Sequence, residues 1–174
     1  MVKRIIFDVD YTLLIPNYRR EHLFFDKFVK EDNAYFINHM HEILTEYEIT
    51  YKKYDLDTLL KHLNKYSDGV ILDENFFESW AKFSTELDEQ DTRVVEDVLS
   101  YLNSKYELVV LSNWFRSVQM AKLEYLDLLK YFVDVYGGDD YIKPNMESFH
   151  LACERHRPEE CIMIGDNLNT DVIG

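Results

Sequence analysis

Four short apolar runs in this sequence end abruptly in small, polar or acidic residues. The runs cover residues 4–7, 106–111, 132–136 and 161–164, and the residues that follow them are Asp8, Ser112, Gly137 and Gly165. Short runs rich in β-branched and aromatic residues are typical of strands buried in a parallel sheet. Helical spacing separates the last three runs, with helices predicted over 115–129 and from residues 143–144 to about 156, as in right-handed crossovers between parallel strands. The pattern predicts an α/β fold with a Rossmann-like parallel sheet core.

A long helical stretch breaks this alternation after the first strand. Apolar residues recur at three- and four-residue steps over about residues 18–65, and further helices are predicted over 57–66, 74–84 and 91–105. We therefore expect a core of residues 1–16 and 91–174 and an inserted helical cap of residues 17–90, placed over the edge where the strands end. The aromatic residues of the cap are predicted to form its own core: Phe24, Phe25, Phe28, Tyr35, Phe36, Phe76, Phe77 and Trp80.

Charge and cysteine content restrict the partners and the compartment. With 19 Lys and Arg against 33 Asp and Glu, the net charge is −14, which disfavours binding to duplex nucleic acid. Cys153 and Cys161 have no spacing that suggests a disulfide scaffold or a zinc site. The apolar run behind the basic start is too short for a signal peptide, and no run is long enough to cross a membrane. We expect a cytoplasmic protein with no membrane partner.

Four carboxylates are predicted to gather where the strands end. Asp8 and Asp10 follow the first strand, and Asp166 and Asp171 follow the last. In parallel α/β sheets, ligands bind at the carboxyl ends of strands. Four acids at one site repel one another unless a cation lies among them, and an oxygen-only ligand set suits Mg²⁺. The sequence therefore predicts an Mg²⁺ site.

The same edge carries groups suited to a phosphate. Lys143 follows the third strand and is the one cation expected nearby, and Ser112 can donate a hydrogen bond. A carboxylate beside a divalent cation can attack phosphorus, and a second one can protonate the leaving alcohol and then deprotonate water. This chemistry assigns Asp8 as nucleophile and Asp10 as general acid and base.

Four motifs, in this order, resemble those of the haloacid dehalogenase-like hydrolase superfamily. They are Asp8-Val9-Asp10-Tyr11-Thr12, Leu111-Ser112-Asn113, Lys143-Pro144-Asn145 and the Gly-Asp-x₄-Asp segment of residues 165–171. The resemblance implies that Thr12 and Ser112 hydrogen-bond the phosphoryl group, with Asn113 beside them, and that Lys143 neutralises its charge. It also implies that Asp8, the backbone carbonyl of Asp10 and Asp166 hold Mg²⁺, while Asp171 orients Lys143 or metal-bound water.

Asp10 favours phosphoryl transfer, because dehalogenases of this superfamily typically lack the second aspartate. The expected function is a Mg²⁺-dependent phosphatase acting on a small phosphorylated metabolite. A phosphosugar mutase, which would use the same two aspartates, and a non-catalytic binding or regulatory protein of the same fold are the alternatives.

The sequence departs from the family pattern in two places. Tyr11 stands where many members have glycine, so its ring is expected to line the substrate entry. Relatives usually continue beyond the fourth motif with the rest of a helix and at least one more strand, so we expect the core to lack a C-terminal part and strand 161–164 to be an exposed sheet edge.

Overall fold

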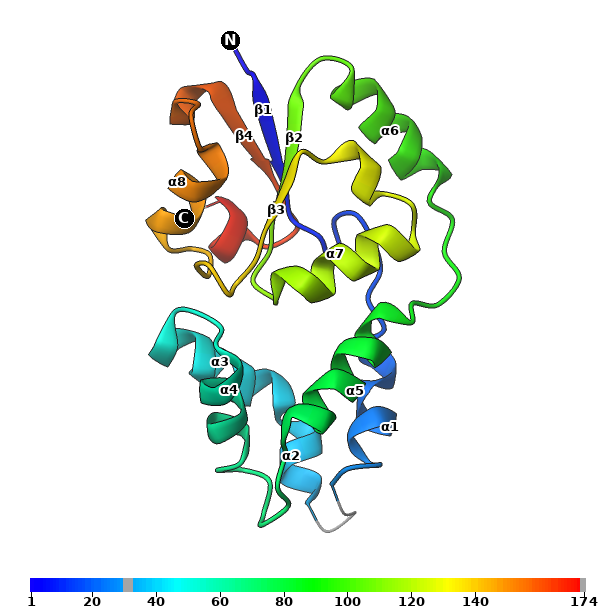
Figure 1. The fold of residues 1–174 in the computed structure, drawn as a ribbon, viewed down its shortest axis with the longest axis vertical. Coiled ribbons are helices and arrows are strands. Elements are labelled where there is room, and N and C mark those ends of the chain that lie inside the picture. Colours follow the sequence, from blue (N-terminus) through cyan, green and yellow to red (C-terminus); the bar gives the residue numbers. More distant parts are fainter. Residues whose placement is uncertain (30–32, 173–174) are drawn as a thin grey trace.

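The described residues of the computed structural model, 1–29 and 33–172, contain a four-stranded parallel sheet (Figure 1). Its strands are β1 (Arg4–Phe7), β2 (Glu107–Leu111), β3 (Asp134–Tyr136) and β4 (Cys161–Ile164). The order is β3-β2-β1-β4, and every neighbouring pair is parallel. All strands therefore end at one edge, as the α/β prediction requires, and β4 is an edge strand as expected.

Helices cover both faces of this sheet because alternate strand residues point to opposite sides. Ile5 and Phe7 pack in one apolar cluster with Leu99 of α6 (Arg93–Asn103) and Leu123 of α7 (Arg116–Tyr125). Ile6 packs on the other side in a cluster with residues of α8 (Met146–Cys153). Helices therefore shield both faces of β1 and β2 and fix their register, whereas Ile162 and Ile164 of the edge strand β4 remain exposed.

A separate group of helices faces the ends of the strands (Figure 1). We call these the cap helices; they are α1 (Glu21–Phe25), α2 (Ala34–Asn38), α3 (Met40–Tyr51), α4 (Leu56–Leu63) and α5 (Glu74–Thr85), preceded by the turn η1 (Tyr18–Arg20). Most of the predicted aromatic residues are buried among them or pack against that core. Tyr35 is the exception, because it is 56% exposed.

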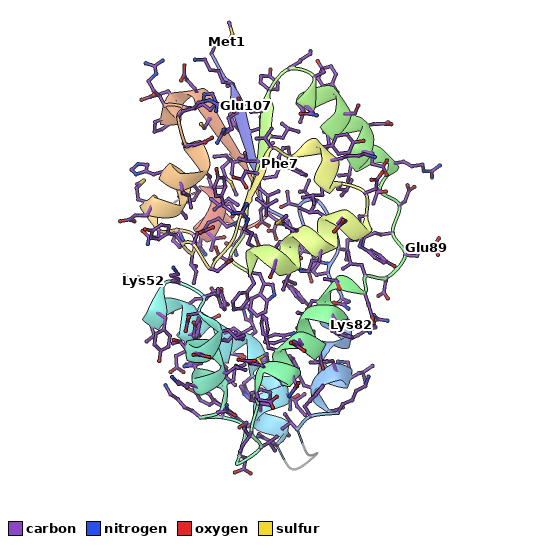
Figure 2. The ribbon with its side chains drawn as sticks, viewed as in Figure 1. Met1, Phe7, Lys52, Lys82, Glu89 and Glu107 are labelled. Carbon is purple, nitrogen blue, oxygen red and sulfur yellow. The ribbon has the colours of Figure 1, made fainter. Side chains whose placement is uncertain are left out.

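Aromatic contacts fasten the cap helices to the loops of the sheet. The ring centroid of Tyr54 lies 5.0 Å from that of Trp114, and Phe77 lies 4.8 Å from Phe115. The backbone N–H of Tyr54 donates to the carbonyl of Gly138 at 2.7 Å. In Figure 2, Lys52 lies where the cap helices meet these loops, whereas Met1 and Glu107 lie at the far end of the sheet.

The two connections between the cap helices and the sheet are joined side by side. The N–H of Ile15 donates to Oε1 of Gln90 at 2.8 Å, and Nε2 of Gln90 donates back to the carbonyl of Ile15 at 3.3 Å. Nδ2 of Asn17 donates to the carbonyl of Phe83 at 2.9 Å. The chain therefore leaves the sheet and returns to it at one place.

Some helix ends differ from the sequence prediction. The predicted helix 115–129 ends at Tyr125, since Asp127 has a left-handed backbone with φ 56°, and a short turn, η2 (Leu129–Tyr131), follows. The helix expected to open at residues 143–144 begins at Met146, where Asn145 accepts from the N–H of Glu147. The remaining elements are a 3₁₀ turn, η3 (Pro158–Glu160), and a short π-helix, η4 (Leu168–Val172). No helix in the described ranges is both long and apolar enough to cross a membrane.

Candidate active site

Asp8 is the first residue after β1, at the edge of the sheet where the strands end. Its N–H donates to the carbonyl of Ile164 at 2.9 Å, which extends the pairing of β1 with β4. The side chain is buried, and Nζ of Lys143 lies 2.7 Å from its Oδ1. Burial raises the pKa of Asp8 to about 6, and the neighbouring Lys143 opposes this rise. Asp8 is therefore a carboxylate at neutral pH, held against a buried cation.

Lys143 joins two of the predicted acids. Its Nζ also donates to Oδ1 of Asp171 at 2.6 Å, and the lysine is only 3% exposed. Both backbone polar groups of Lys143 are bound by the side chain of Asn113, the N–H at 2.7 Å and the carbonyl at 3.0 Å. Asn113 lies beside the site as predicted, but its amide fixes the Lys143 loop.

Three carboxylates form a candidate metal site. Oxygens of Asp8, Asp166 and Asp171 all lie within 4.8 Å of one another. Mg²⁺ binds oxygens at about 2.0–2.1 Å, so oxygens on opposite sides of the ion lie about 4 Å apart. The spacing and the all-oxygen donor set therefore fit this ion with a small inward movement. The carboxylate of Asp10 is not in this group, so only its backbone carbonyl could join it.

The carboxylate of Asp10 is held by a second buried lysine that the sequence analysis missed. Nζ of Lys122, which is 2% exposed, lies 2.8 Å from Oδ1 of Asp10. Nε2 of Gln119 and the hydroxyl of Tyr18 donate to Oδ2 at 2.9 and 3.1 Å. The expectation that Lys143 is the one nearby cation is wrong. A signal was available, because Gln119 and Lys122 lie three residues apart on the buried face of α7.

The two hydroxyls predicted to bind phosphate have different positions. Ser112 follows β2, lines the cavity described below, and its Oγ accepts from Nε2 of Gln119 at 2.7 Å. Thr12 is not brought to the cavity: its Oγ1 is buried and has no hydrogen-bond partner in the described structure. The reason is the turn after Asp10, where Tyr11 adopts φ 63° and the N–H of Thr12 bonds back to Val9. The contact predicted between the Thr12 hydroxyl and the phosphoryl group stays a prediction.

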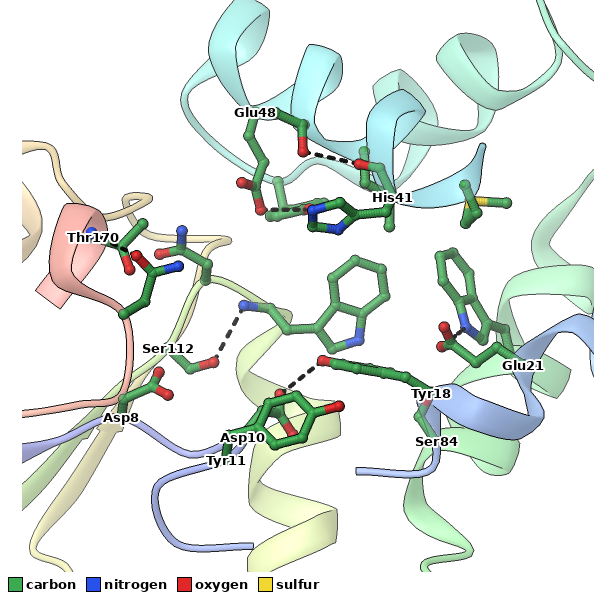
Figure 3. Close-up of a pocket in the computed structure, with 18 of the residues that line it drawn as sticks. Asp8, Asp10, Tyr11, Tyr18, Glu21, His41, Glu48, Ser84, Ser112 and Thr170 are labelled. Carbon is green, nitrogen blue, oxygen red and sulfur yellow. Dashed lines mark hydrogen bonds between the residues drawn. The ribbon is translucent and has the colours of Figure 1, made fainter. Parts of the chain in front are cut away.

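A cavity of about 670 Å³ connects these groups with the cap helices (Figure 3). Asp8, Asp10 and Ser112 lie at its sheet end, while His41 and Glu48 of α3 face them from the cap. Tyr11 lines the cavity as expected, with its ring 6.0 Å from that of Tyr18. The cavity is large enough for a small phosphorylated molecule.

Comparison with known proteins agrees with this arrangement. The model of the haloacid dehalogenase-like hydrolase family matches residues 2–174, and the chain therefore belongs to this family of hydrolases.

Individual relatives are distant. The chain is 26% identical to YfnB of Bacillus subtilis over 124 residues, which is 67% of this chain and 49% of YfnB. It is 34% identical to human N-acylneuraminate-9-phosphatase over 92 residues, which is 49% of this chain and 37% of the phosphatase. The chain thus spans at most about half the length of these curated relatives.

Solved structures share the fold. YfnB bound to magnesium superposes with a TM-score of 0.69 at 22% identity, covering 98% of this chain and 82% of YfnB. A 2-haloacid dehalogenase of Pseudomonas syringae gives a TM-score of 0.70 at 19% identity, covering 99% and 81%. At these identities the likeness concerns the fold.

Proposed function

We propose that this chain is a Mg²⁺-dependent phosphatase that hydrolyses a small phosphorylated metabolite through an aspartyl-phosphate on Asp8. The observation that carries the proposal is the buried contact of 2.7 Å between Asp8 and Lys143, at the bottom of a cavity that also contains Asp10. The N-acylneuraminate-9-phosphatase relative supports phosphoryl transfer. Asp10 argues against dehalogenase chemistry, since dehalogenases of this family typically lack an acid at that position.

In the first step, a carboxylate oxygen of Asp8 attacks phosphorus and forms an acyl phosphate. The bond between phosphorus and the leaving oxygen breaks, and Asp10 gives that oxygen a proton. Lys143 offsets the charge that would otherwise keep the phosphate away from Asp8. Ser112 lies at the same end of the cavity, where its hydroxyl can contact the phosphoryl group.

In the second step, Asp10 removes a proton from a water molecule that attacks the same phosphorus atom. The bond between phosphorus and Asp8 breaks, inorganic phosphate leaves, and the Asp8 carboxylate is restored. Lys122, Gln119 and Tyr18 keep the Asp10 carboxylate in one position through both proton transfers. They are positioning residues in this proposal.

Asp8, Asp166 and the backbone carbonyl of Asp10 would hold Mg²⁺, with Asp171 at the edge of the site. When bound, the ion would supply positive charge that neutralises the phosphate and the acids around it. Lys143 alone faces two carboxylates, so a divalent cation would reduce the repulsion among the acids of the site.

The test is phosphate release from p-nitrophenyl phosphate by the purified chain, with millimolar Mg²⁺ and with EDTA. We expect turnover with Mg²⁺ only. Asp8→Asn should retain less than a few per cent of it, because the amide is a far weaker nucleophile. Asp10→Asn should slow hydrolysis of an alkyl phosphate by about 10²–10⁴-fold. Equal rates with EDTA, or an active Asp8→Asn variant, would contradict the proposal.

A further inference from the structure

The cavity continues from the catalytic acids to a chamber formed by the cap helices. On α3, the residues His41, Thr45 and Glu48 are four and three positions apart, so they share one face, and all three line the cavity. Glu21 of α1 lines it as well. A leaving group attached to a phosphate at Asp8 would have to occupy this chamber.

Aromatic rings form part of the chamber wall. The ring of Trp114 lies 4.9 Å from that of Trp80 and 5.0 Å from that of Tyr54, and all three line the cavity. Such a wall offers a flat apolar surface to the C–H face of a small ring or chain. The wall does not by itself select a charge on the leaving group.

Two carboxylates in the chamber are each oriented by one of these rings. Nε1 of Trp80 donates to Oε1 of Glu21 at 3.1 Å, and the hydroxyl of Tyr54 donates to Oε1 of Glu48 at 2.9 Å. Oε2 of each glutamate accepts no hydrogen bond from the residues that the structure describes. Each acid is thus fixed through one oxygen and keeps the other available as an acceptor.

The lysines of the cavity are already paired with acids. Lys122 is bound to Asp10, and Lys143 is bound to both Asp8 and Asp171. Among the described lining residues there is no arginine, and the other side chains that could carry a positive charge are His22 and His41. A second anion on the leaving group would therefore meet Glu21 and Glu48 without an unpaired lysine to offset the repulsion.

We propose that the substrate is a phosphomonoester whose leaving group carries hydroxyl or amino groups and no second anionic group. Its donors bind Glu21 and Glu48, and its apolar face lies against Trp114. This inference rests on the proposed phosphatase function and adds the chemical class of the leaving group.

Three six-carbon phosphates test the proposal: glucosamine 6-phosphate carries an amine, glucose 6-phosphate carries only hydroxyl groups, and the open-chain 6-phosphogluconate carries a second anion. We expect kcat/KM at pH 8 with Mg²⁺ to be at least about tenfold higher for the first two than for 6-phosphogluconate, a difference of about 1.4 kcal/mol. Glu48→Gln should reduce the preference for glucosamine 6-phosphate over 6-phosphogluconate by about tenfold, because the amide neither attracts the amine nor repels the carboxylate.

Glu46→Gln is the matched control. Glu46 is on the same helix, but it is exposed, bonds to Tyr66 and does not line the cavity. This control should leave the preference unchanged. Thermal unfolding of both variants shows whether they fold, and Glu21→Gln provides a second test if Glu48→Gln is unstable.

The outcomes separate the two proposals. If the chain hydrolyses p-nitrophenyl phosphate but accepts 6-phosphogluconate as well as the others, or accepts none of the three, the leaving-group proposal is wrong and the phosphatase proposal stands. If no phosphate is released from any compound, the leaving-group proposal is tested by calorimetry, which measures how tightly each of the three phosphates binds. The three phosphates should then still bind in the stated order, and equal or reversed affinities would overturn it.

Discussion

Nζ of Lys122 lies 2.8 Å from Oδ1 of Asp10, although the two residues are 112 positions apart in the sequence. The lysine comes from the last turn of α7 and the aspartate from the turn after β1, so the contact depends on how that helix packs against the sheet. A buried cation therefore fixes the carboxylate to which we assign both proton transfers.

Lys122→Met should impair both stability and turnover. Removing the cation leaves Asp10 partly buried without its ionic partner, which we expect to cost about 2–3 kcal/mol of unfolding free energy, less than for a fully buried pair. The rate of phosphate release should fall at least about tenfold as the carboxylate loses its fixed position. Urea unfolding and steady-state kinetics measure the two effects.

Lys130→Met is the control for this variant. Lys130 is an exposed lysine paired with Asp127, and surface pairs contribute little to stability. A Lys122→Met protein with the turnover of the parent would show that Asp10 does not need this partner.

Asp166→Ala should abolish stabilisation by Mg²⁺. A ligand that binds only the folded chain adds about 2.7 kcal/mol when its concentration is 100 times Kd, so millimolar Mg²⁺ should raise the Tm of the parent above its value in EDTA. The variant should show no such rise, and in EDTA it should melt no lower than the parent, because one repelling carboxylate has been removed. Asp97→Ala, on the exposed face of α6, should respond to Mg²⁺ like the parent. If Asp166→Ala shifts as much as the parent, Asp166 is not a ligand.

Glu107, which lies far from the active site, should make the free energy of unfolding depend on pH. Hydrogen bonds from Arg4 and then His156 hold its pKa at about 2, below the usual value of about 4.3. The folded pKa is lowered, so the stabilisation is fully present above pH 4.3 and is lost as the pH falls toward 2. Glu107→Gln should cost about 1 kcal/mol at pH 7, because solvent partly screens this pair.

The difference between Glu107→Gln and the parent should shrink in urea unfolding experiments between pH 5 and pH 3. Glu159→Gln, an exposed glutamate nearby, should show no such trend. A difference that stays constant with pH would contradict the role of the Glu107 charge.

Gly138→Ala should loosen the contact between the cap helices and the sheet loops. A Cβ atom at Gly138 would lie 2.3 Å from the carbonyl oxygen of Asn113 and 2.7 Å from Cδ2 of Tyr54. Forcing these groups apart should cost about 1–3 kcal/mol, measured by urea unfolding, and raise KM because the chamber wall moves. A variant as stable as the parent would show that the loops relax at little cost.

The part of the site that could be predicted from the sequence is the part attached directly to strand ends. Asp8 and Ser112 directly follow buried strands, and Asp166 lies two residues beyond the edge strand β4. Parallel strands bring their carboxyl ends together whatever the details of the loops. Lys143 and Asp171 lie one loop further on, and their motifs placed them at the same edge. Their catalytic and metal-binding roles remain predictions.

The other features depend on three-dimensional geometry that the spacing of residues in the sequence does not determine. Tyr11 adopts a left-handed backbone in the turn that precedes Thr12, and the Thr12 hydroxyl is buried and does not line the cavity. Lys122 reaches Asp10 through the packing of α7, and a lysine within a helical pattern is usually expected to face solvent. The end of α7 was similarly missed, because the left-handed residue is Asp127 and not a glycine.

The bridge between Ile15 and Gln90 has a consequence for how such proteins can diversify. The segments that leave the sheet and return to it are hydrogen-bonded to each other at its edge. For the sheet, the residues between Ile15 and Gln90 therefore form a loop whose two ends are held together at one point. The free-energy cost of closing such a loop rises by only about 0.6 kcal/mol for each doubling of its length. We infer that the segment between Ile15 and Gln90 could be shortened, lengthened or replaced during evolution while β1 stays paired with β2 and β4. A change of substrate would then leave the positions of the catalytic acids unchanged.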